Sequence, residues 1–112
     1  MRKHLKISYL NILLNGVLKM YLVGIEVKIR FYSVHSLKEK RRIVKSILDK
    51  TRHKFQISTA EVDYHDSLDQ AALGFGIVTN NHKHAETILQ KVINSIDTES
   101  EAEIYNIDWI SC

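Results

Sequence analysis

Apolar side chains recur at every second position from residue 21 to residue 31. They are Tyr21, Val23, Ile25, Val27, Ile29 and Phe31. Glycine or charged residues stand between most of them, at Gly24, Glu26, Lys28 and Arg30. Successive side chains of a strand point to opposite faces of its sheet, so this period of two predicts a strand with one buried face.

Two segments have the spacing of amphipathic helices. Ser36 and Glu39 form a capping-box pattern that predicts the start of the first helix, which we expect to end near His53. Its apolar side is predicted to comprise Leu37, Val44, Ile47 and Leu48, with Ile43 at the border. Asn80 or Asn81 is predicted to cap the second helix. The apolar stripe of that helix consists of Ala85, Ile88, Leu89, Val92, Ile93 and Ile96.

Three further strands complete the expected pattern, at residues 54–63, 71–79 and about 102–110. In the first of these we expect a switch of face around Thr59–Ala60. The order is β-α-β-β-α-β, which predicts an α+β ferredoxin-like sandwich with two helices on one face of a four-stranded antiparallel sheet.

The sheet face away from the helices is predicted to mix glycine with charge. It would carry Glu26, Lys28, Arg30, Gly74 and Gly76, with some of Ile104, Tyr105, Ile107 and Trp109. A partner often completes such a face, so we expect a homodimer formed through it or through an edge strand.

Residues 1–19 are predicted to be separate from a domain at residues 20–112. They are too short and too polar to span a bilayer. Two interpretations stay open: an amphipathic appendage, or a start site assigned too early, with Met20 as the true first residue. The one cysteine, Cys112, favours neither a disulfide nor structural zinc, so we expect a cytoplasmic protein with no membrane association.

Charge is sorted by position along the chain. Ten Lys/Arg and two acids lie between Lys28 and Lys54, whereas two Lys/Arg and ten acids lie between Phe55 and Cys112. The formal net charge of +3 therefore conceals a basic segment and an acidic segment. A concentrated basic segment predicts contact with phosphate, or with an acidic patch on another protein.

Several short motifs resemble the YlxP-like family of small bacterial proteins, a domain of unknown function. The motifs are Ser36-Leu37-Lys38-Glu39-Lys40-Arg41-Arg42-Ile43-Val44, Ala60-Glu61-Val62-Asp63, Leu73-Gly74 and Val78-Thr79-Asn80. The resemblance covers about Met20 to Trp109. It implies a ferredoxin-like fold with no established catalytic residues. The family's genes commonly lie among translation and ribosome-maturation genes, so the resemblance implies work near the ribosome.

The first helix is the best candidate site. Lys38, Arg42, Lys45 and Arg52 are predicted on its solvent side, with Arg41 at the flank and Lys40 near the apolar border, where its stem could snorkel. These cations predict phosphate contacts with RNA or a ribosomal particle and no DNA sequence readout. The alternative is an ordinary solvated helix. The central strands lack the aromatic residues of a base-stacking platform.

An acidic cluster follows the second strand, at Glu61, Asp63, His65, Asp66 and Asp69. Oxygen ligands suit a hard metal ion, but no calcium-loop spacing is present, so we expect these acids to pair with the basic helix, within the monomer or across a dimer. No nucleophile motif, phosphate loop or zinc-hydrolase signature is present. We therefore predict a protein without enzyme activity, cofactor or metal that binds RNA. A protein-interaction module is the alternative, followed by a metal- or small-molecule-dependent regulator.

Overall fold

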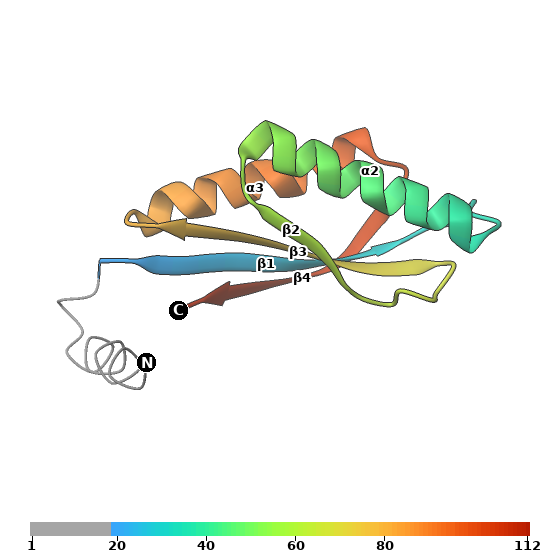
Figure 1. Cartoon of the computed structure of the whole chain (residues 1–112), viewed down its shortest axis with the longest axis horizontal. Helices are drawn as coiled ribbons and strands as arrows, with labels where there is room; N and C mark the ends of the chain where they lie inside the picture. The colour runs from blue at the N-terminus through green and yellow to red at the C-terminus, as the bar shows by residue number, and fades with distance from the viewer. Residues whose placement is uncertain (1–18) are drawn as a thin grey trace, which may run out of the picture.

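A computed structural model of the chain describes residues 19–112. Its elements follow the order β1 (Tyr21–Arg30), α2 (Leu37–Phe55), β2 (Ser58–Asp63), β3 (Gln70–Thr79), α3 (His82–Glu99) and β4 (Glu103–Ser111). The four strands form one antiparallel sheet in the order β2-β3-β1-β4. Both helices cover the same face of this sheet, and no helix among the described residues covers the other face, which we call the bare face (Figure 1). The predicted ferredoxin-like α+β fold is confirmed. Both interpretations of residues 1–19 concern a segment that lies, apart from Lys19, outside the described residues.

The core lies between the sheet and the two helices. The alternating side chains of β1 point into it, and Val27 and Ile29 are completely buried. β3 contributes Leu73 and Phe75, while α3 contributes Leu89 and Val92. The period of two in β1 and the stripe on α3 therefore identified the core-facing positions, because both patterns follow directly from the geometry of the elements.

Both helices begin where the sequence predicts. Ser36 caps α2 by accepting a hydrogen bond from the Glu39 backbone N–H at 3.1 Å, and the Glu39 carboxylate accepts from the His35 backbone N–H at 3.3 Å. The carboxylate thus bonds one residue before the N-cap instead of the N-cap itself. Asn81 caps α3 through the His84 backbone N–H at 3.1 Å.

The predicted end of the first helix and the predicted switch of face in the second strand are wrong. α2 continues to Phe55, which the sequence analysis had placed in a strand, and ends at Gln56 in the left-handed conformation with φ of 54°. The irregularity in β2 lies between Glu61 and Asp63 rather than around Thr59–Ala60. The register is regular from Ser58 to Glu61, so Glu61, like Thr59, lies on the face that packs against the helices, opposite the core residue Leu73.

Candidate nucleic-acid interface

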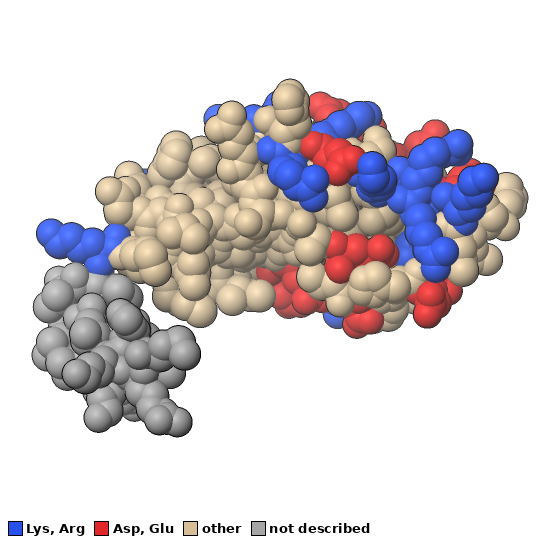
Figure 2. All heavy atoms as spheres, viewed as in Figure 1, with Lys and Arg blue, Asp and Glu red and all other residues tan. Residues whose placement is uncertain are grey.

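The structure brings four of the five predicted site residues together on the first turns of α2. Lys38, Arg41, Arg42 and Lys45 line one open recess of about 570 Å³, together with Ser36 and Glu39. We call this surface the basic recess. Their spacing of three and four residues places them on one side of the helix. Figure 2 shows Lys and Arg side chains gathered along α2, with acidic groups below them.

Two of these cations have weak internal partners. Arg41 lies 3.5 Å from Asp66, and the two side chains are 57% and 93% exposed. Lys45 lies 3.4 Å from Asp49, one turn further along the helix. Exposed pairs of this kind contribute little stability, so both cations remain available to an external anion. Within residues 19–112, no ion pair involves Lys38 or Arg42.

Arg52 lies outside the basic recess. Its guanidinium donates to Asp49 at 3.0 Å and to the Thr59 hydroxyl at 2.9 Å. The bond to Thr59 joins the end of α2 to β2, while Asp49 lies on α2 itself. Arg52 therefore has a structural role at this position, and the centre of the candidate site lies in the first half of α2.

Lys40 differs most from its predicted position. Its side chain is 0% exposed rather than snorkelling at the surface. The ammonium donates to Glu61 Oε2 at 3.0 Å and to the Tyr64 carbonyl at 2.7 Å. A buried ammonium needs such partners, because an unpaired charge in a core is costly. Lys40 thereby anchors the β2–β3 connection beneath α2.

The acidic segment therefore pairs with the basic helix within the monomer, as predicted, through Lys40–Glu61 and Arg41–Asp66. Over residues 19–112, no group of three or more His, Cys, Asp or Glu side chains is arranged to hold a metal ion.

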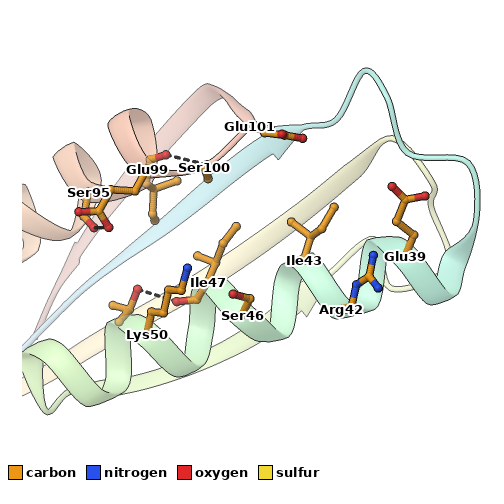
Figure 3. Close-up of a pocket in the computed structure, with 12 residues that line it drawn as sticks. Glu39, Arg42, Ile43, Ser46, Ile47, Lys50, Ser95, Glu99, Ser100 and Glu101 are labelled. Atoms are coloured by element: carbon orange, nitrogen blue, oxygen red, sulfur yellow. Dashed lines mark hydrogen bonds between the residues drawn. The ribbon is translucent and has the colours of Figure 1, made fainter.

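A second hollow, of about 480 Å³, lies between α2 and α3 (Figure 3). Glu39 and Arg42 line both this hollow and the basic recess. Arg42 and Lys50 line its α2 wall, while Glu99 and Glu101 lie on the opposite wall. Ser95 donates a hydrogen bond to Glu99 at 3.0 Å. Because carboxylates repel phosphate, this hollow limits a phosphate-binding surface to the outer side of α2.

Sequence reasoning missed a hydrogen-bonded chain at the far end of the sheet. His82 contacts Ser111 Oγ through Nε2 and Glu86 through Nδ1, both at 2.8 Å. The order matches an acyl-transfer triad, but the carboxylate that orients the histidine of such a triad is buried, whereas Glu86 is 52% exposed. We therefore assign these hydrogen bonds a structural role: they join the end of β4 to the start of α3. No sequence signal links residues 29 positions apart.

Comparison with known proteins gives the family. Residues 23–109 match the family described as "Protein of unknown function (DUF503)". The chain belongs to the DUF503 family. A DUF503 relative is the "Uncharacterized protein YlxP" of Bacillus subtilis (strain 168), which is 35% identical over 80 residues, 70% of this chain and 87% of the relative. The predicted YlxP-like membership is confirmed.

Among solved structures, this DUF503 chain is similar to the de novo designed protein Foldit4. The TM-score is 0.47 at 12% identity, with 83% of this chain and 96% of the designed chain covered. Neither helix in the described part of the chain is long and apolar enough to cross a membrane.

Proposed function

We propose that this protein binds RNA, alone or within a ribosomal particle, through the basic recess on α2. The observation that carries the proposal is the convergence of Lys38, Arg41, Arg42 and Lys45 around one concave surface. Phosphate oxygens are the ligands that such a group of exposed cations favours. In this account the protein acts in the cytoplasm by binding, without enzyme activity or a cofactor.

Double-stranded or folded RNA is the favoured ligand class. Recognition of an RNA duplex relies on shape and on backbone contacts rather than on base stacking. The exposed aromatic residues Tyr32, Tyr105 and Trp109 do not line the basic recess. The recess therefore offers charge without the stacking surface that single-stranded RNA needs.

The direct test is a titration of the full-length protein with an RNA duplex at several salt concentrations. Each phosphate contact contributes roughly −0.9 to the slope of log K against log salt, so four contacts predict a slope of about −3.6. Reversing Arg42 and Lys45 to Glu should flatten this slope by about 2.

A matched control reverses the same number of charges on the other helix. Lys83 and Lys91 lie exposed on α3. The Lys83→Glu/Lys91→Glu variant should bind RNA much more tightly than Arg42→Glu/Lys45→Glu. Equal loss in the two variants would mean that net charge, and not the basic recess, governs binding.

A protein-interaction module is the second candidate function. The pairing of Arg41 with Asp66 and of Lys45 with Asp49 supports it, because carboxylates already occupy part of the site. An acidic surface of a partner could take the place of these internal carboxylates. Salt-sensitive association with an acidic protein, without RNA affinity, would favour this candidate.

A further inference from the structure

The bare face of the sheet has a hollow at one end. Cross-strand register places Gly24 of β1 opposite Gly76 of β3 and Ile110 of β4. The exposed side chains of Leu22, Val62, Val78 and Ile110 surround these glycines and line a depression of about 510 Å³. We call this depression the glycine hollow.

Among the described residues, no neighbouring atom prevents a side chain at position 76. A Cβ at Gly24 would lie 3.0 Å from the Phe75 carbonyl oxygen, and one at Gly74 would lie 3.0 Å from Val62. At Gly76 a Cβ would meet no atom of the described residues 19–112 within 4 Å. Glycine inside a strand weakens it and often marks the close approach of another molecule. The missing side chain at position 76 therefore leaves room for something other than the described residues 19–112.

The other end of the same face carries a ridge. The Tyr105 ring of β4 lies over the Arg30 guanidinium of β1, which is 4.6 Å from the ring centroid. The Tyr105 hydroxyl donates to Gln70 on β3 at 2.6 Å. The ring thus reaches across β1 and stands above the face. Tyrosine and arginine are common anchors at protein interfaces.

Ridge and hollow lie on either side of two rows of opposite charge. Glu26 lies opposite Asp108, and the next row of the face contains Lys28. Consider a two-fold axis that lies in the plane of the interface, midway between these rows and perpendicular to the strands. This axis would place residue 26 against residue 28 of a second copy. The same axis would place residue 24 against residue 30. The Tyr105–Arg30 ridge of each copy would then enter the glycine hollow of the other.

We propose that the bare sheet face is the interface of a homodimer with this ridge-into-hollow register. This inference is independent of the RNA proposal, because α2 lies on the other face of the sheet. The area is sufficient. β1 and β3 have 10 residues each, β4 has 9 and β2 has 6. At about 3.3 Å per residue and about 4.8 Å between strands, the flat face measures roughly 550 Å², and protruding side chains add to this, whereas each partner of a standard interface buries roughly 800 Å².

The main test substitutes Gly76→Val in the full-length protein and measures association by sedimentation equilibrium. Valine fills the hollow, so the dimer dissociation constant should rise about ten- to a hundredfold. The monomer has room for valine and gains strand propensity, so at a dilution where both proteins are monomeric the melting temperature of the variant should exceed that of the wild type by about 2–6 °C. The Arg42→Glu/Lys45→Glu variant should dimerise normally.

Charge exchange tests the register. Glu26→Lys or Lys28→Glu alone should weaken the dimer, and Glu26→Lys/Lys28→Glu together should restore it, because both contacts of the symmetric pair are exchanged. A wild-type protein that stays monomeric at about 200 µM would overturn the proposal. A Gly76→Val protein that melts below the wild type at a dilution where both are monomeric would also overturn it, since another part of the chain would then occupy the hollow.

Discussion

Lys40 on α2 donates a hydrogen bond to Glu61 on β2 over 3.0 Å, and its side chain is completely buried. This pair crosses the boundary between the helices and the sheet. It fixes the β2–β3 connection under the helix whose outer side forms the basic recess. The same helix therefore uses one cation internally for structure and presents its other cations to solvent.

Removing the Lys40 charge should destabilise the fold. Lys40→Met leaves the Glu61 carboxylate, which is 16% exposed, without its partner, and we expect a loss of about 3 kcal/mol in the free energy of unfolding. The double variant Lys40→Met/Glu61→Leu should recover most of this loss. Urea unfolding measures both. A Lys40→Met protein as stable as the wild type would show that the pair is dispensable.

Asp66 should weaken RNA binding by occupying one side of Arg41. Replacing it by Asn should lower the dissociation constant for duplex RNA roughly two- to threefold at low salt, and should change stability by less than about 0.5 kcal/mol because the pair is exposed. Asp97→Asn on α3 is the matched control, since it makes the same charge change on the exposed surface of another helix. Equal gains in the two variants would contradict a local effect.

Gln56 offers a stability test away from both proposed interfaces. Its φ of 54° lies in the left-handed region, and its backbone N–H donates to the Arg52 carbonyl at 2.8 Å to close the end of α2. Glycine adopts this conformation without steric cost, so Gln56→Gly should raise the free energy of unfolding by about 1 kcal/mol. Thermal unfolding measures the shift, and a lower melting temperature would contradict it.

Periodicity and capping chemistry account for most of what the sequence could predict. The alternation in β1 and the stripe of α3 follow from element geometry, while Ser36 and Asn81 bond within one helical turn. The end of α2 was missed because Gln56, rather than glycine, adopts the left-handed conformation there. The local sequence does not predict the left-handed conformation of Gln56.

The candidate site was predictable in part. A helical projection places Lys38, Arg41, Arg42 and Lys45 together, because only helix geometry is involved. Lys40 and Arg52 are engaged by Glu61 and Thr59 on β2, and those contacts depend on the tertiary packing of α2 against β2. The glycine hollow and the Tyr105 ridge depend on cross-strand register, which a single sequence does not give.

Co-sedimentation of the full-length protein with purified small ribosomal subunits is the most direct test of the central claim. We expect the protein to bind at low salt and to dissociate at high salt. Binding should be lost in the Arg42→Glu/Lys45→Glu variant and retained in the Lys83→Glu/Lys91→Glu variant. Binding that survives reversal of Arg42 and Lys45 would contradict the basic recess as the contact. No binding at low salt would contradict the ribosomal role itself.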